Sequence, residues 1–222
     1  MAQDTKSTDY GGSGLKNFLR PLVPQRFLKE RDVFIRLGAA GPTYAKLRVL
    51  DAVGVRRKNQ RGVSPSARSF LFVCYGNIMR SPMAEHMLKR AALKMGQQEI
   101  LVNSAGIHAT PGTGAHPRAM VAARELGVAL DTHQSQLLTA EMVAQSDVIF
   151  AMDLQNQAEL LTEFPHARDK ILLLSIYAEG SQRFREIPDP YFGDQEAARH
   201  CGAVLETCIH NLAESIWVVE RR

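Results

Sequence analysis

The sequence has no long apolar stretch. Nothing in its 222 residues approaches the run of about 18 consecutive apolar residues that a membrane-spanning helix needs. The first residues also lack the basic and apolar regions of a secretory signal. Cysteine is scarce, and three cysteines without close pairing fit a reducing compartment better than a disulfide framework. We therefore expect a cytoplasmic protein, with attachment to the surface of a membrane as the alternative.

Metal-ligand patterns are missing as well. The chain has seven histidines, but none has metal-ligand spacing with the cysteines, so we expect neither a metal site nor a cofactor. What the sequence does contain is ordinary for a globular protein, with 45% apolar and 23% charged residues.

Positive charge is concentrated in the first third of the chain. Residues 1–69 hold 14 Lys and Arg against 5 Asp and Glu, which gives +9, and the remainder carries −5 of the net +4. Because the remainder is not basic, we do not expect nucleic acid as a substrate. Residues 1–14 are polar and are predicted to be a disordered tail. Residues 15–68 are predicted to be a basic helical extension and linker, with three helical pieces between Leu15 and Val53.

The role of residues 15–68 stays open from the sequence. Apolar side chains recur at helical spacing in the second and third pieces, with basic side chains largely elsewhere. Such helices can pack against the rest of the chain, dock on a protein partner, or lie on an anionic membrane surface.

One stretch carries a pattern that predicts chemistry. Phe70 to Val73 is a short run of aromatic, aliphatic and β-branched residues, as a buried strand should be. Gly76 and Asn77 tolerate positive φ, so the next residues can fold back with their N–H groups pointing inward. Ser81 and Pro82 are expected to supply the N-cap and the first residue of a helix. A strand, a tight loop and a helix N-terminus together predict an anion-binding cradle.

Cys74 and Arg80 make this cradle a candidate reaction centre. A thiol among converging N–H donors, beside a guanidinium and a helix N-terminus, is favoured as the thiolate. The guanidinium of Arg80 can hold two oxygens of a phosphate while Cys74 attacks the phosphorus. A buried cysteine at the end of a strand is the simpler interpretation, and the flanking strand, Gly-Asn and Ser-Pro favour the functional one.

From Phe70 the chain alternates between strand and helix patterns. Strands are expected near Phe70–Val73, Ile100–Val102, Asp147–Met152 and Ile171–Leu174, and the longest helix from about Asp194 or Gln195 to Val218. Alternation of this kind predicts an α/β fold with three layers, a four-stranded parallel sheet with helices on both faces. Ligands bind beyond the carboxyl ends of such strands, which is where Cys74 is placed.

Val73 to Glu85 resembles the signature loop of the low-molecular-weight protein tyrosine phosphatases. The resemblance covers about residues 69–219 and leaves the first 68 outside, so 69–222 is the expected phosphatase domain. It continues through Asn103–Gly106, Pro117–Ala119, His133, Asp147–Asp153 and Asp189–Tyr191. The resemblance implies hydrolysis of phosphotyrosine in a protein substrate through a cysteinyl-phosphate intermediate. The implied phosphate-binding residues are Tyr75, Gly76, Asn77, Ile78, Met79, Arg80 and Ser81.

The proton donor is expected at Asp189. Two prolines flank this residue and stiffen the loop, which suits a carboxyl group that acts first as an acid and then as a base. An ordinary turn aspartate is the alternative, and the resemblance to the family's Asp-Pro-Tyr loop favours the catalytic role. Tyr191 and Phe192 would line the mouth of the pocket.

The resemblance also implies a set of supporting residues. The hydroxyl of Ser81 would donate to the sulfur of Cys74, while Asn77 and His133 would hold the loop in shape.

The chain departs from the family pattern in two places. Met79 stands where many members have a second cysteine, and residues 107–115 supply no aromatic wall. The second feature is closer to the bacterial members that act on tyrosine autokinases of exopolysaccharide export, so we expect a substrate of that kind. An arsenate reductase of the same fold is disfavoured because no cysteine lies between Cys74 and Cys201. A non-catalytic phosphotyrosine-binding protein is disfavoured by the intact Cys74, Arg80 and Asp189.

Overall fold

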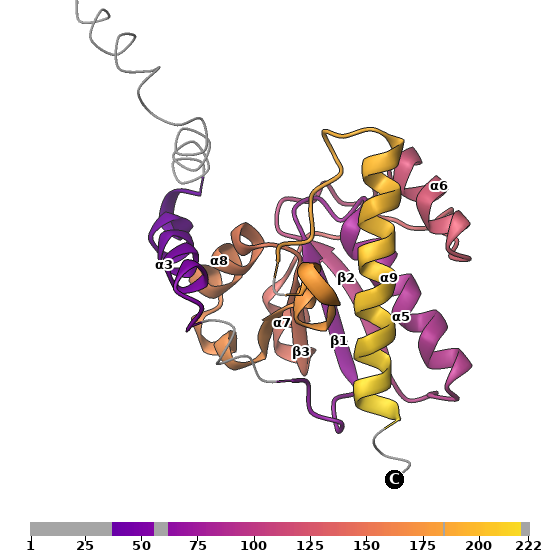
Figure 1. The fold of residues 1–222 in the computed structure, drawn as a ribbon, viewed down its shortest axis with the longest axis horizontal. Helices are drawn as coiled ribbons and strands as arrows, with labels where there is room; N and C mark the ends of the chain where they lie inside the picture. Colours follow the sequence, from indigo (N-terminus) through magenta and orange to yellow (C-terminus); the bar gives the residue numbers. More distant parts are fainter. Residues whose placement is uncertain (1–36, 56–61, 184, 219–222) are drawn as a thin grey trace, which may run out of the picture.

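The computed structural model describes residues 37–55, 62–183 and 185–218. The predicted tail at 1–14 and the first two predicted helical pieces, up to residue 36, lie outside them. Within the described part, three layers are visible, with a central sheet and helices on both sides (Figure 1). None of the helices described is both long enough and apolar enough to cross a membrane.

The sheet has four parallel strands in the order β2-β1-β3-β4. β1 (Ser69–Cys74) lies between β2 (Leu101–Gly106) and β3 (Val148–Ala151), and β4 (Ile171–Leu173) follows beyond β3. The α/β prediction is confirmed. β2 is longer than predicted, because it continues beside β1 until Gly106 is opposite Cys74.

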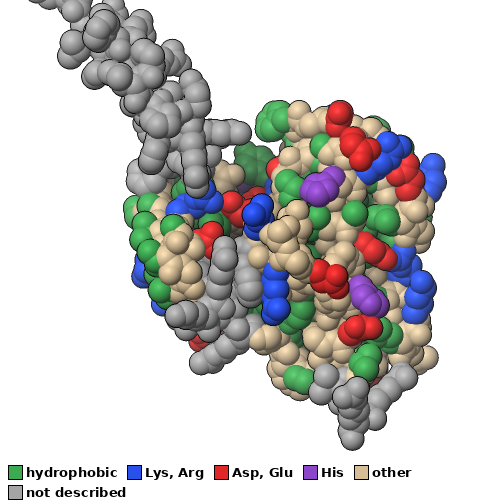
Figure 2. Space-filling model, in the orientation of Figure 1, with side chains coloured by type: hydrophobic (Ala, Val, Ile, Leu, Met, Phe, Trp, Pro, Cys, Tyr) green, Lys and Arg blue, Asp and Glu red, His purple; other side chains and the backbone are tan. Residues whose placement is uncertain are grey.

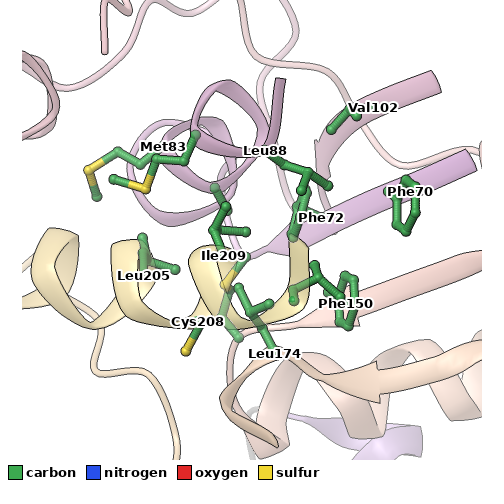
Figure 3. Close-up of a cluster of buried hydrophobic side chains, with 14 of the residues drawn as sticks. Phe70, Phe72, Met83, Leu88, Val102, Phe150, Leu174, Leu205, Cys208 and Ile209 are labelled. Carbon is green, nitrogen blue, oxygen red and sulfur yellow. The ribbon is translucent and has the colours of Figure 1, made fainter. Parts of the chain in front are cut away.

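Alternate residues of the strands face two separate cores. Phe70, Phe72 and Phe150 face one core, which lies under α5 (Arg80–Lys94), α6 (Pro117–Glu125) and α9 (Gln195–Trp217). The rings of Phe72 and Phe150 stack with centroids 5.4 Å apart. Phe72 lies beside Leu88 of α5 and Ile209 of α9 (Figure 3).

The opposite face of the sheet is covered by α7 (Ala140–Gln145) and α8 (Leu154–Glu163), and α3 (Gly41–Ala52) packs against α8 (Figure 1). Leu71, Val73, Ile149 and Ala151 point into this second core. Short 3₁₀ helices complete the described chain: η2 (Gly38–Ala40), η3 (Pro165–Lys170), η4 (Leu174–Tyr177) and η5 (Gly180–Gln182).

α9 is the longest described helix, as the sequence predicts, and it joins α5 and α6 through ion pairs as well as through the core. Arg90 binds Glu206, and Arg199 binds Glu125. Acidic and basic side chains are interspersed on this face of the molecule (Figure 2). Cys201 and Cys208 are small core residues of this helix, and burial raises the pKa of both thiols to about 12.

The third predicted helical piece of the extension is α3, and it packs against α8. Tyr44 is only 6% exposed and belongs to the second core. The hydroxyl groups of Thr43 and Thr162 lie 3.1 Å apart, and Nη1 of Arg48 lies 3.0 Å from Oε2 of Glu186. For residues 15–68 the sequence left three alternatives open: packing against the rest of the chain, a protein partner, or a membrane surface. For α3 the structure shows the first of these. A protein partner or a membrane surface stays a prediction for the residues before it.

Replacing Tyr44 by alanine tests how firmly α3 is held. The loss of a buried aromatic side chain should lower the free energy of unfolding by about 3 kcal/mol. Val49→Ala is the matched control on the same helix, because Val49 is 61% exposed and its truncation should cost less than about 0.5 kcal/mol. Urea denaturation of the full chain measures both. Equal stabilities of the two variants would contradict the packing of α3.

Candidate active site

The loop after β1 leads directly into α5, and the helix begins two residues earlier than the sequence suggests. Met79 is the N-cap and Arg80 the first helical residue, and no side chain caps the helix. The prediction that Ser81 is the N-cap and Pro82 the first helical residue was wrong. The reason is that the hydroxyl of Ser81 is turned toward the loop, where it meets Cys74, Asn77 and the carbonyl of Ala105. The first N–H groups of α5 thus remain available to an anion.

The sulfur of Cys74 is buried at the centre of this loop. The N–H of Asn77 donates to Sγ at 3.3 Å, and Oγ of Ser81 lies 3.0 Å from it. Oγ of Ser81 accepts from Nδ2 of Asn77 at 2.9 Å, so its own hydrogen is free to point to the sulfur, which is closer than the carbonyl of Ala105 at 3.3 Å.

Asn77 is the residue on which the shape of the loop depends. Its φ is +53°, and no other described residue except glycine has a positive φ. Its amide nitrogen donates to Ser81 and to Ser104, its amide oxygen accepts from the N–H of Gln136, and its carbonyl accepts from Nε2 of His133 at 2.7 Å. These contacts hold a conformation that is otherwise uncommon for a residue with a side chain.

Gly106 allows the loop to approach β2. A Cβ at this position would lie 2.8 Å from backbone atoms of Tyr75, Gly76 and Asn77, closer than packed atoms can come. The glycine is thus required by the position of the loop.

Arg80 binds two carboxylates with one guanidinium. Nη1 lies 2.6 Å from Oδ2 of Asp153, and Nη2 lies 2.7 Å from Oδ2 of Asp189. Nη1 also donates to the carbonyl of Ile187 at 3.3 Å. Burial acts to lower the pKa of Arg80, but the charges of Asp153, Asp189 and Cys74 outweigh this effect and raise the pKa above its usual value. The guanidinium therefore stays charged.

Asp153 and Arg118 are two contributors that the sequence reasoning missed. Asp153 follows β3 at the carboxyl end of the sheet and caps α8, because its Oδ1 accepts from the N–H of Asn156 at 2.7 Å. The signals in the sequence were its position at the end of a strand and its place in Asp147–Asp153, a stretch that resembles the family. Arg118 donates to the carbonyls of Tyr191 and Gly193, and so fastens the segment that follows Asp189.

The side chain of Asp189 lies at the border between the site and solvent. It is 42% exposed, and its Oδ1 accepts from the N–H of Tyr191 at 3.1 Å. Tyr191 is partly exposed and Phe192 is 92% exposed, with ring centroids 5.0 Å apart. Tyr75 is also exposed, and its ring centroid lies 4.6 Å from that of His108. His108 belongs to residues 107–115, the segment that supplies no aromatic wall.

The predicted site residues are thus brought to one edge of the sheet. Arg80 contacts Asp189, Cys74 contacts Asn77 and Ser81, and His133 contacts Asn77. The remaining loop residues differ in environment. Met79 is buried in the first core, Ile78 is half-buried with its carbonyl bound by the N–H of His116, and Gly76 is half-buried.

A family model described as low molecular weight phosphotyrosine protein phosphatase matches residues 69–220. The chain belongs to this family. Both the resemblance inferred from the sequence and the expectation of an enzyme are therefore confirmed.

Relatives within the family carry two different names. The low molecular weight protein-tyrosine-phosphatase Etp of Escherichia coli (strain K12) is 34% identical over 148 residues, which are 67% of this chain and 94% of that one. A protein-arginine-phosphatase of Bacillus subtilis (strain 168) is 35% identical over 146 residues, 66% of this chain and 95% of that one. The crystal structure of the Erwinia amylovora tyrosine phosphatase AmsI superposes with a TM-score of 0.60, at 36% identity over 67% of this chain and 93% of that one.

Removal of the Asp153 carboxylate tests the buried ion pair. Asp153→Ala should lower the free energy of unfolding by about 3–5 kcal/mol, because a buried guanidinium loses a partner and α8 loses its cap. Asp131→Ala is the control, since Asp131 pairs with Arg124 at the surface and its loss should cost less than about 1 kcal/mol. Thermal and urea denaturation measure both, and a cost for Asp153→Ala as small as that for Asp131→Ala would show that the pair contributes little.

Proposed function

We propose that this protein is a protein tyrosine phosphatase that works through a cysteinyl-phosphate intermediate. The observation that carries the proposal is the direct contact of Arg80 with Asp189 beside a loop in which two hydrogen-bond donors reach the sulfur of Cys74. In this proposal Cys74 is the nucleophile, Arg80 the phosphate clamp and Asp189 the general acid and base. Residues 69–222 form the phosphatase domain, with α3 as an added element.

In the first step the thiolate of Cys74 attacks the phosphorus of the substrate. The S–P bond forms while the P–O bond to the tyrosine breaks. The N–H groups of Tyr75, Gly76, Asn77, Ile78, Met79, Arg80 and Ser81 and the guanidinium of Arg80 bind the phosphate oxygens. The phosphate takes the place of the Asp189 carboxylate as a partner of Arg80, so Asp189 can carry a proton and deliver it to the departing phenolate oxygen.

In the second step water hydrolyses the intermediate. Asp189, now ionised, accepts a proton from the water, whose oxygen attacks the phosphorus as the S–P bond breaks. Cys74 leaves as a thiolate, which the hydroxyl of Ser81 and the N–H of Asn77 stabilise. His133 and Asn77 keep the loop in the geometry that both steps need.

The aromatic side chains at the mouth favour a phenyl ring as the group next to the phosphate. Tyr191 and Phe192 stand beside Asp189, and Tyr75 directly follows the nucleophile. Aromatic walls can sandwich a tyrosine ring. Together with the relatives named tyrosine phosphatases, this supports phosphotyrosine as the group that is hydrolysed. From the sequence resemblance to bacterial members, we propose a tyrosine kinase or a related exopolysaccharide protein as the substrate.

Phosphoarginine is the second candidate. Two of the relatives are named protein-arginine-phosphatases, at 34% and 35% identity. The partly exposed carboxylate of Asp189 could face a guanidinium as well as a phenol.

Substitution of the nucleophile and of the acid tests the mechanism. Cys74→Ser should abolish hydrolysis of p-nitrophenyl phosphate, and Asp189→Ala should lower kcat by about 10²- to 10⁴-fold. The loss in Asp189→Ala should be larger for phenyl phosphate, whose leaving group needs the proton more. Asp131→Ala, which removes a surface carboxylate, should keep full activity. The enzyme proposal fails if wild type and Cys74→Ser are equally inactive, and phosphotyrosine binding without turnover would then be the remaining interpretation.

Peptides of one sequence that carry either phosphotyrosine or phosphoarginine decide the substrate. We expect kcat/KM to be at least tenfold higher for phosphotyrosine, and Phe192→Ala and Tyr191→Ala to raise KM for that peptide. Leu93→Ala, which truncates an exposed side chain on α5, should leave KM unchanged. A preference for phosphoarginine would replace the tyrosine assignment with the second candidate.

A further inference from the structure

Three side chains with metal-ligating atoms converge near the loop of residues 75–79 between β1 and α5, which we call the phosphate loop. Glu85 and His86 lie on α5, and His133 comes from the segment between α6 and α7. One ligand atom from each lies within 4.8 Å of the other two, and the two imidazole rings have centroids 6.3 Å apart. We propose that Glu85, His86 and His133 form a binding site for a divalent transition-metal ion of the zinc class.

His133 is oriented by a hydrogen bond to the backbone of Asn77. Its Nε2 lies 2.7 Å from the carbonyl oxygen of Asn77. A carbonyl only accepts, so Nε2 carries a hydrogen, and Nδ1 is the ring nitrogen that remains for a metal ion. Metal-ligating histidines commonly donate their second ring N–H to a backbone carbonyl in this way, which orients the ring.

His86 connects the cluster to solvent. The residue is half-buried on α5, directly after Glu85, and its ring centroid lies 6.3 Å from that of His133. Its partly exposed side chain gives an ion a path from solvent to the buried Glu85 and His133.

Glu85 supplies the negative charge. Its side chain is buried, with Oε2 bound by the hydroxyl of Ser104 and Oε1 by Nζ of Lys89. Each carboxylate oxygen keeps a further lone pair for a metal ion. Lys89 is the competing cation, but its side chain is 47% exposed and can move into solvent.

Two histidines and one glutamate match the ligands that zinc takes in proteins with an open fourth position. Zinc bonds of about 2.0–2.1 Å place tetrahedral ligand atoms about 3.3 Å apart, so any pair at the 4.8 Å limit would have to approach by about 1.5 Å. His86 is half-buried, so its side chain has room to move toward Glu85 and His133.

The site would be joined to the phosphate loop through Asn77. His133 binds its carbonyl, and Ser104 bonds both to its amide nitrogen and to Glu85. A bound ion would thus fix two of the groups that hold Asn77 in its left-handed conformation.

Zinc titration of the metal-free full chain tests the site. Cys74→Ser serves as the parent protein, because it removes a thiolate that could itself bind zinc. Isothermal titration calorimetry should show one saturable site, and Co²⁺ should give the visible absorption of a tetrahedral complex with nitrogen and oxygen ligands. Adding His86→Gln should weaken binding by at least tenfold. Adding His210→Gln, which removes an exposed histidine paired with Glu214, should leave it unchanged.

Removal of the competing charge gives a result that misfolding cannot imitate. Lys89→Met should tighten zinc binding severalfold, because Glu85 then loses its cationic partner. The proposal is overturned if the parent binds no zinc, if His86→Gln binds it as tightly as the parent, or if Lys89→Met does not tighten binding. These measurements use a protein without the nucleophile, so their outcome is independent of the phosphatase activity.

Discussion

The two-sided ion pair of Arg80 is the interaction on which the site depends. Its guanidinium is almost completely buried, and a charge in that position is tolerated only when it is paired and hydrogen-bonded. Asp153 supplies the inner partner from the end of β3, and Asp189 supplies the outer partner from the loop before α9. One side chain at the start of α5 therefore connects the central strand, its neighbour and the loop that carries the second carboxylate. The loop that carries Asp189 is connected to the start of α5 through this ion pair.

The phosphate loop is held by a second set of contacts that centre on Asn77. Its positive φ turns the chain so that the N–H of Asn77 faces the sulfur of Cys74. Every hydrogen-bonding group of its side chain is engaged, and its carbonyl is engaged as well. A strained residue held by this many partners gives a loop that is already shaped for an anion, so little ordering has to be done when a phosphate arrives.

Sequence patterns predicted the elements of this fold well and its long-range contacts poorly. The four strands and the long final helix follow from local periodicity, and the structure confirms them. The helix start at Arg80 was predicted two residues late, because the hydroxyl of Ser81 prefers a sulfur that only the folded loop brings near. Asp153 escaped notice since its partner lies 73 residues away. His133 and His86 are likewise brought together only by the tertiary structure, and no spacing in the sequence indicates that they lie close to each other.

Glu186 joins α3 to the segment that precedes Asp189. It accepts from Arg48 of α3 through one oxygen and from the N–H of Leu154, the first residue of α8, through the other. Sequence similarity to the family begins at Ser69, but this contact and the packing of Tyr44 extend the folded unit back across that limit. A polypeptide cut at Ser69 would expose the apolar surface of α8 that Tyr44 covers, and such a surface favours self-association in water. The natural boundary for a stable fragment of this protein therefore lies ahead of η2, well before the residue at which its relatives begin.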